Sequence, residues 1–172
     1  QATRFGLNIV KDKALSIEIH ADKSEKTVVL KDGAIRCKSI IVASGAHARK
    51  IDVEGEERLT GKGVSYCATC DGAFSEDCII SVVGGGDQAV EEGLYLTKFG
   101  RQVNIIHRRN ELRATKVIQE KAFNNPKIKF IWDTVVTGIH GEELVESVTL
   151  KNLKTGDISQ MATDSVFVFV GM

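Results

Sequence analysis

The alternation of apolar and polar positions predicts that the N-terminal quarter of the chain is built from short strands. Apolar and polar side chains alternate along residues 15–20, which is the period of a half-buried strand. Residues 27–30 and 34–37 predict two more strands, joined by an Asp32–Gly33 turn of the kind that favours hairpins. The continuous apolar run at residues 39–43 is typical of a strand buried on both faces of a parallel sheet. No helix pattern accompanies these strands, so we expect this part to form a poor core by itself.

From residue 78 the pattern changes to strands that alternate with helices, which predicts a β-α-β unit in a parallel sheet. Apolar residues recur at near-helical spacing from Ala89, and Gly100 is a typical helix stop. A second helix is expected to end before Pro126, because the residue preceding proline disfavours the helical conformation. In order, the predicted elements are a strand at 78–83, a helix at 89–99, a strand at 103–106, a helix at 114–123 and a strand at 129–132.

After residue 133 the pattern predicts a β-meander that ends in a buried strand. Gly141 and Thr155–Gly156 are the expected turns. The meander strands are predicted at 134–140, 146–151 and 157–162, and the final apolar strand at 165–170. The chain is therefore expected to be an α/β protein with a parallel sheet.

Composition excludes some function classes without choosing one. The 172 residues carry 23 basic and 23 acidic side chains, so no net charge would draw the protein to nucleic acid or to an anionic membrane. No apolar run approaches the roughly 20 residues that a membrane helix needs, and the first residues show no signal-peptide pattern. The 4 cysteines are too few for a secreted disulfide scaffold, which favours a reducing, cytoplasmic compartment and one reactive pair.

Cys67 and Cys70 are the first candidates for chemistry. A C-x-x-C pair can close a small disulfide ring where the chain turns or begins a helix, and such pairs exchange two electrons readily. Asp71 follows directly and would place a proton donor and acceptor beside the sulfurs. The same spacing also serves zinc sites and static disulfides. Zinc would need Cys37 and Cys78 as well, without a second C-x-x-C or a His pair. We predict no metal site, and we expect these last two cysteines to be inert core residues.

A glycine-rich turn stands between the first strand and the first helix of the β-α-β unit, in the form G-x-G-x-x-A. In such a turn the first glycine makes the bend, the second lets the backbone approach a pyrophosphate, and the small third residue allows helix packing. The N–H groups at the start of the helix favour phosphate. The candidate cofactor-binding residues here are Gly84, Gly86, Asp87, Gln88 and Ala89.

The end of the next strand indicates which dinucleotide is bound. NAD sites place an acid about 20 residues after the turn, whereas this strand ends in His107, Arg108 and Arg109, with Arg113 close behind. Guanidinium groups suit a ribose 2′-phosphate, which arginine can grip in bidentate fashion. NADPH is therefore favoured over NADH. His107 is assigned a binding-site position only, and the arginines could instead form a solvated face.

Taken together, these motifs resemble the low-molecular-weight thioredoxin reductases, which are pyridine nucleotide-disulfide oxidoreductases. The resemblance rests on Cys-Ala-Thr-Cys-Asp-Gly at 67–72, on the glycine turn and helix start at 84–92, and on His-Arg-Arg at 107–109. It covers most of residues 39–172. Ser44 is a mild departure, because the family more usually has Thr in that segment.

The resemblance implies an activity and assigns roles. Cys67 would attack the disulfide of thioredoxin, Cys70 would exchange electrons with a flavin, and Asp71 would act as acid and base. The implied enzyme is an NADPH-dependent thioredoxin-disulfide reductase, a homodimer that uses FAD and NADPH.

The resemblance also implies how the chain is divided. A Rossmann-like three-layer NADPH-binding domain, with a central parallel sheet and a β-meander, would span residues 47–170. Residues 1–46 would be a partial FAD-binding domain, and residues 171–172 would return toward it. The FAD fingerprint of the family lies upstream of anything in this sequence. We therefore expect a fragment that holds FAD poorly or not at all.

Two other functions compete with this one. A flavoprotein reductase of a peroxiredoxin would use a related dithiol module on a different protein substrate. A non-catalytic module could bind NADPH without turnover. The Ala68–Thr69 pair between the cysteines favours thioredoxin as the substrate.

Overall fold

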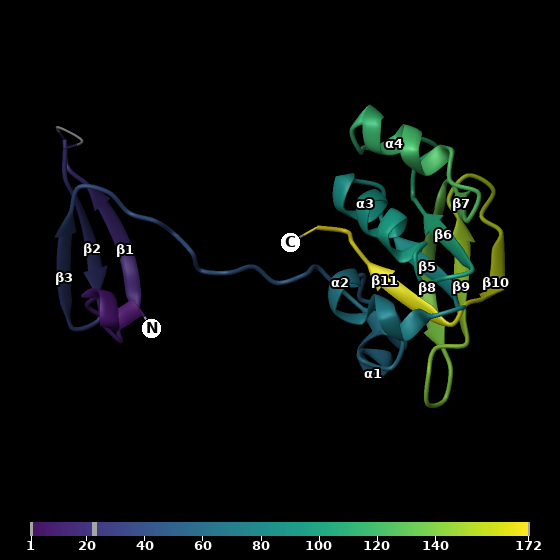
Figure 1. Ribbon diagram of the computed structural model, residues 1–172, viewed down its shortest axis with the longest axis horizontal. Coiled ribbons are helices and arrows are strands. Elements are labelled where there is room, and N and C mark those ends of the chain that lie inside the picture. The colour runs from purple at the N-terminus through teal and green to yellow at the C-terminus, as the bar shows by residue number, and fades with distance from the viewer. Residues whose placement is uncertain (1, 22–23, 172) are drawn as a thin grey trace. The chain divides into compact units, whose positions relative to one another are not determined.

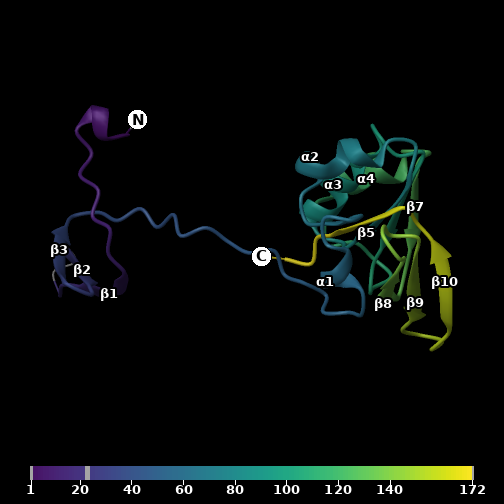
Figure 2. The same cartoon turned by 90° about the horizontal axis from the view of Figure 1, so that it is seen from below.

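A computed structural model describes residues 2–21 and 24–171 of the chain (Figures 1 and 2). The chain divides into two compact units, Gln1–Gly45 and Ala46–Met172. In Figure 1 the first unit is purple to dark blue, and the second runs from blue-teal to yellow.

The first unit is a three-stranded antiparallel sheet of order β1-β2-β3. It contains the 3-10 helix η1 (Ala2–Phe5) and the strands β1 (Ala14–Ile19), β2 (Lys26–Leu30) and β3 (Gly33–Cys37). Leu30 pairs with Gly33, so Lys31 and Asp32 form the hairpin loop, one residue earlier than predicted. Every residue of β1 is exposed, which agrees with the absence of a helix pattern to cover these strands.

One predicted strand is wrong. Residues 39–43 form no strand, and the side chains of Ile41 and Val42 are 94% and 71% exposed. A parallel strand exists only when a neighbour completes its ladder of hydrogen bonds, and no strand within residues 2–21 and 24–171 pairs with this segment. The apolar pattern reports what the segment prefers, but it does not report whether a partner strand is present.

A five-stranded parallel sheet of order β4-β11-β5-β6-β7 forms the centre of the second unit. Its strands are β4 (Val64–Ser65), β5 (Ile79–Val83), β6 (Gln102–Ile106), β7 (Ile128–Ile131) and β11 (Ser165–Val168). Strand β11 comes from the end of the chain and inserts between β4 and β5. The predicted parallel sheet is confirmed for β5, β6, β7 and β11, with strand ends shifted by one or two residues, whereas β4 was not predicted.

The two longer helices cover one face of this sheet, and an antiparallel meander covers the other (Figures 1 and 2). The helices α3 (Asp87–Leu96) and α4 (Lys116–Phe123) were predicted, whereas the short α1 (Glu56–Leu59), α2 (Ala68–Asp71) and 3-10 helix η2 (Gly72–Ser75) were not. The meander, of order β10-β9-β8, consists of β8 (Thr134–His140), β9 (Ser147–Asn152) and β10 (Ile158–Ala162). None of the helices in the described part of the chain has the length and apolar character needed to cross a membrane.

The side chains of β5 and β6 divide the core into two clusters. Val82 and Ile105 pack on the helix side, together with Val90 of α3. The next residues along these strands, Val83 and Ile106, belong to the cluster shared with the meander. This alternation follows from the pleat of a strand, which points successive side chains to opposite faces. The fold is therefore the predicted Rossmann-like, three-layer α/β arrangement.

Candidate functional site

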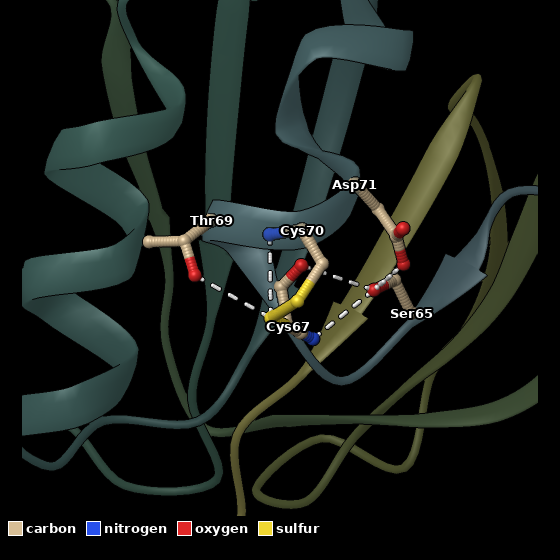
Figure 3. The surroundings of a disulfide bond; sticks show 5 residues. All are labelled: Ser65, Cys67, Thr69, Cys70 and Asp71. Carbon is tan, nitrogen blue, oxygen red and sulfur yellow. Dashed lines mark hydrogen bonds between the residues drawn. A yellow bond between two sulfur atoms is a disulfide. The ribbon is translucent and has the colours of Figure 1, made fainter. Parts of the chain in front are cut away.

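Cys67 and Cys70 form a disulfide at the start of α2 (Figure 3). Cys67 is the N-cap residue of this helix, and Cys70 lies three residues further on. Residues three apart in a helix lie on one face, which brings the two Cα atoms to 5.3 Å and lets the sulfurs bond. Sulfurs joined in this way do not serve as thiolate ligands for zinc.

The start of α2 also places hydrogen-bond donors beside the sulfur of Cys67. The N–H of Cys70 lies 3.3 Å from Cys67 Sγ, and the Thr69 hydroxyl lies 3.4 Å from it. Once the disulfide is reduced, such donors stabilise a negative charge on the sulfur, as helix N-termini do for thiolates. The arrangement therefore favours Cys67 as the nucleophile of the pair.

Ser65 holds Asp71 beside the disulfide (Figure 3). Its hydroxyl donates to Asp71 Oδ2 at 2.6 Å and accepts the backbone N–H of Cys67 at 3.1 Å. Ser65 is itself fixed, because it ends β4 and pairs with Phe167 of β11. The parallel sheet thus sets the position of the carboxylate. Sequence reasoning missed Ser65, whose only signal was a serine two residues before the first cysteine.

A cavity of about 580 Å³ lies at the carboxyl ends of β5, β6 and β11. In open α/β sheets, ligands bind outside the carboxyl ends of the strands. All the predicted cofactor-binding residues except Arg109 line this cavity.

Close contacts explain two of the glycines at the cavity. Gly84 has a φ of +148°, and a Cβ there would lie 2.4 Å from the carbonyl oxygen of Phe169. A Cβ on Gly85 would lie 2.3 Å from the ring of His107. By contrast, a Cβ on Gly86 would meet nothing within 4 Å. Gly86 is the N-cap of α3, so there is open space at the helix N-terminus where a phosphate would bind.

His107 is buried in the cavity wall, and its Nε2 has no hydrogen-bond partner among the described residues. Burial lowers the pKa of His107, and the charges of Arg108 and Arg109 lower it further. The ring is therefore neutral at neutral pH. Because an unpaired buried nitrogen is destabilising, this atom indicates a place for a polar group of a ligand.

The loop that carries the arginines is tied to the glycine turn. The N–H of Arg113 donates to the carbonyl of Gly85 at 2.7 Å. The carboxylate of Asp87 accepts the N–H of Thr115, also at 2.7 Å. Asp87 thus anchors the loop, in addition to lining the cavity.

Arg49 and Lys50 also line the cavity, and sequence reasoning missed them. They lie in the connection before α1, and the N–H of Arg49 donates to the carbonyl of Gly171 at 2.9 Å. Two adjacent basic residues were the only signal in the sequence, because the contact with the far end of the chain arises from the fold.

The disulfide and the cavity are separate sites. No residue from Cys67 to Asp71 lines the cavity. A dinucleotide bound there would therefore not contact the sulfurs in this arrangement.

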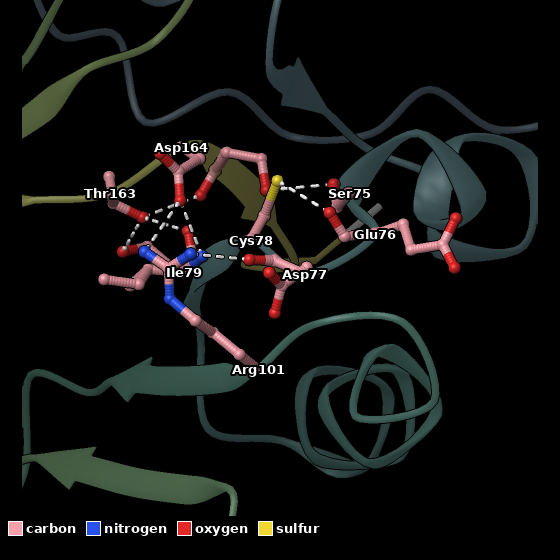
Figure 4. Close-up of polar contacts among 10 residues, drawn as sticks. Ser75, Glu76, Asp77, Cys78, Ile79, Arg101, Thr163 and Asp164 are labelled. Atoms are coloured by element: carbon pink, nitrogen blue, oxygen red, sulfur yellow. Dashed lines mark hydrogen bonds and ion pairs between the residues drawn. The ribbon is translucent and has the colours of Figure 1, made fainter.

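Cys78 lies among polar groups that close the amino ends of β5 and β11 (Figure 4). Its thiol donates to the carbonyl of Glu76 at 3.4 Å, and Asp164 accepts the N–H of Ile79 at 2.7 Å. Burial raises the pKa of Cys78, and the charge of Asp164 raises it further. The thiol therefore stays protonated at neutral pH, which does not suit disulfide exchange. Cys78 and Cys37 are half-buried, so the expected core position is only partly correct.

Comparison with known sequences places the chain in a family. The sequence profile of the pyridine nucleotide-disulphide oxidoreductases matches residues 7–172. The chain is 48% identical over 177 residues to the thioredoxin reductase of Peptoclostridium acidaminophilum, covering 99% of this chain and 56% of that protein. It is 47% identical over 156 residues to the thioredoxin reductase of Bacillus subtilis, covering 90% and 49%. The chain thus spans about half the length of these relatives.

Solved structures agree with the sequence comparison. Thioredoxin reductase from Lactococcus lactis has a TM-score of 0.79 at 47% identity, covering 93% of this chain and 52% of that one. Thioredoxin reductase from Giardia duodenalis has a TM-score of 0.85 at 34% identity, covering 99% and 55%. The resemblance to thioredoxin reductases is therefore confirmed in both sequence and fold. The chain belongs to the pyridine nucleotide-disulphide oxidoreductase family.

Proposed function

We propose that this chain is the NADPH-binding and disulfide-bearing part of a thioredoxin reductase. The main support is the Cys67–Cys70 disulfide, which lies at a helix start beside Asp71 in a chain 48% identical to a thioredoxin reductase. On this proposal residues 47–170 form the NADPH domain, and residues 1–46 belong to an FAD domain. Residues 171–172 lead back to the FAD domain, although Met172 lies outside the described residues.

The proposed partners are thioredoxin and a second copy of the enzyme. The whole reductase would work as a homodimer in the cytoplasm, without nucleic acid or membrane. The balance of 23 basic and 23 acidic residues supports a protein that needs neither of these polyanionic partners.

NADPH fits the cavity at three points. Its pyrophosphate would lie over Gly86 at the N-terminus of α3, where a Cβ would meet nothing within 4 Å. Its 2′-phosphate would meet Arg108 and Arg113, which line the same cavity. A polar group of the ligand would pair with Nε2 of His107. When bound, NADPH supplies a hydride, and the part of these residues is to bind and orient it.

FAD does not fit this chain in the same way. Family members use flavin and nicotinamide cofactors in general, but the 172 residues contain one G-x-G-x-x-A turn, and that turn lines the NADPH cavity.

Purified protein of residues 1–172 is therefore expected to carry little or no flavin. Absorbance spectroscopy of the protein, followed by release of any cofactor in acid, would measure the flavin content. The full reductase, expressed in the same host, is the control. A stoichiometric flavin spectrum from residues 1–172 would contradict the expectation.

The thiol chemistry belongs to this chain's own residues. In the reduced state, the Cys67 thiolate attacks the thioredoxin disulfide, which forms a mixed disulfide and releases one thioredoxin thiol. Cys70 then attacks the Cys67 sulfur, which restores the Cys67–Cys70 disulfide and releases the second thiol. Two electrons and two protons pass to thioredoxin. Asp71, held by Ser65, is placed to move the proton.

Replacing Asp71 with asparagine is expected to leave the disulfide intact and to lower turnover of the full enzyme about a hundredfold, the usual scale for lost proton transfer. Steady-state reduction of thioredoxin measures the turnover, and thiol titration measures the disulfide. Asp77→Asn is the matched control, because it removes the same charge from an exposed residue six positions further on. Equal turnover in both variants would remove Asp71 from the mechanism.

A comparison of two protein substrates tests the proposed function itself. The full flavoenzyme is given NADPH with either thioredoxin or a peroxiredoxin as acceptor, and NADPH oxidation is followed. We expect rapid oxidation with thioredoxin. Preference for the peroxiredoxin would favour a flavoprotein reductase of a peroxiredoxin. Binding of NADPH without turnover on either protein would favour a non-catalytic NADPH-binding module.

A further inference from the structure

Glu56 is a buried carboxylate that the disulfide chemistry does not use. It is only 2% exposed, at the first position of α1. Three donors reach it: the N–H of Ile51 at 3.1 Å, the N–H of Asp52 at 2.7 Å and the hydroxyl of Tyr66 at 2.8 Å. A buried carboxylate is stable only when its lone pairs are occupied in this way, so these bonds define the local backbone.

The bonds from Glu56 fix the segment 49–52 against the cavity. Asp52 adopts a φ of 55°, a left-handed turn that reverses the chain where the carboxylate holds it. At the other end, the N–H of Arg49 donates to the carbonyl of Gly171 at 2.9 Å. The segment is held at both ends, and its residues Arg49, Lys50 and Ile51 line the cavity.

The order of the strands gives the place of Arg49 within the cavity. Strand β5 lies between β11 and β6. Gly171, which follows β11, therefore lies at one end of the cavity, and Arg108, which follows β6, lies at the other. The glycine turn after β5 lies between them. Arg49 lies at the β11 end of the cavity, because its backbone N–H donates to the carbonyl of Gly171.

A dinucleotide bound along the carboxyl ends of these strands would have its two halves at opposite ends of the cavity. With the 2′-phosphate near Arg108 and the pyrophosphate near the glycine turn, the nicotinamide half extends toward β11. Arg49 forms no ion pair with any residue in the ranges 2–21 and 24–171. Its charge is therefore available to the second phosphate or to the ribose beyond it.

We propose that Arg49 binds the nicotinamide half of NADP(H), and that Glu56 is the positioning residue that holds Arg49 in the cavity wall. This inference rests on the proposed function, since it requires that the cavity binds NADP(H). It assigns the two ends of the cavity to different parts of one ligand, with Arg108 at the adenosine end.

Two ligands distinguish the two ends of the cavity in a binding experiment. Adenosine 2′,5′-bisphosphate carries the adenosine half only, whereas NADP⁺ carries both halves. Calorimetric titration of the 172-residue chain is expected to show that Arg49→Ala weakens NADP⁺ binding about tenfold, the lower end for lost charged hydrogen bonds. Binding of the bisphosphate should change less than about twofold, within the scatter of independent sites. Lys62→Ala, which removes a charge from an exposed residue of the same unit, is the control and should leave both affinities unchanged.

Glu56→Gln tests the positioning role, because its amide can no longer accept at both oxygens. It should produce the same selective loss of NADP⁺ affinity. If Glu56 acts through Arg49, the double variant will bind NADP⁺ no more weakly than Arg49→Ala alone. Circular dichroism checks the fold. If Glu56→Gln does not fold, Glu56→Asp replaces it in the same cycle, with a smaller loss expected in the same direction.

The outcomes separate this inference from the proposed function. If the unmodified chain binds neither ligand, both fail. If Arg108→Ala weakens both ligands and Arg49→Ala weakens neither, or weakens both equally, the NADPH site stands and the role of Arg49 is overturned. Additive losses in the double variant would overturn the positioning role of Glu56.

Discussion

Replacing Cys70 with serine is expected to trap Cys67 in a stable mixed disulfide with thioredoxin. Exchange needs one sulfur to attack the partner and a second to resolve the product. In the structure the N–H of residue 70 lies 3.3 Å from Cys67 Sγ. This backbone donor survives the substitution, so Cys67 keeps its activation while losing its resolving thiol.

The partner protein must also be unable to resolve the bond. A thioredoxin with its second active-site cysteine replaced by serine, and its first activated as a thionitrobenzoate mixed disulfide, meets this condition. Attack by Cys67 then releases one thionitrobenzoate anion for each covalent complex formed. Release of the coloured anion gives the rate, and a non-reducing gel gives the yield.

Cys67→Ser is the reverse variant and is expected to react far more slowly. Cys70 lies inside the first turn of α2, whereas Cys67 is the N-cap and has the N–H of Cys70 and the Thr69 hydroxyl beside its sulfur. Cys78→Ser is the control and should leave the rate unchanged, because burial raises the pKa of that thiol. If the disulfide had only a structural role in fixing a loop, the two serine variants would react alike and no complex would accumulate with either.

Features with a local geometric cause could be predicted from the sequence. The C-x-x-C spacing needs only one helical turn to bring Cys67 and Cys70 together, and the structure supplies it. The glycine turn needs a strand before it and a helix after it, and both are present as β5 and α3. In each case the interacting residues lie within one supersecondary unit, so the pattern contains the information.

Features that depend on distant strands could not be predicted. Ser65 reaches Asp71 from β4, whose position depends on pairing with β11 from the end of the chain. Arg49 enters the cavity wall through its bond to Gly171. The segment 39–43 shows the converse, because its β pattern is clear and no described strand pairs with it.

Arg109 shows that position within a motif also could not be predicted from the sequence. Its neighbours Arg108 and Arg113 line the cavity, whereas Arg109 does not. Adjacent residues at the end of a strand point in different directions, so the motif alone could not say which guanidinium groups reach the ligand. The assignment of Arg109 to the cofactor stays a prediction, and the structure gives it the weakest support of the three arginines.

Replacing Arg108 and Arg113 together with alanine is expected to abolish the preference of the chain for NADPH over NADH. Both residues line the cavity that we propose binds NADPH, whose ribose 2′-phosphate is absent from NADH. Each lost charge-assisted hydrogen bond costs about 1.5–3 kcal/mol. The affinity for NADPH should therefore fall by at least about a hundredfold. The affinity for NADH should change little.

Titration of the 172-residue chain with each cofactor, by calorimetry or nucleotide fluorescence, measures both affinities. Lys121→Ala, on the exposed surface of α4, controls for the loss of positive charge at a distance from the cavity. Arg109→Ala is expected to have the smallest effect of the three arginine variants. Equal weakening of NADPH and NADH would mean that the arginines meet a part shared by both cofactors. The 2′-phosphate would then have to bind elsewhere, and the choice of NADPH would lose its physical basis.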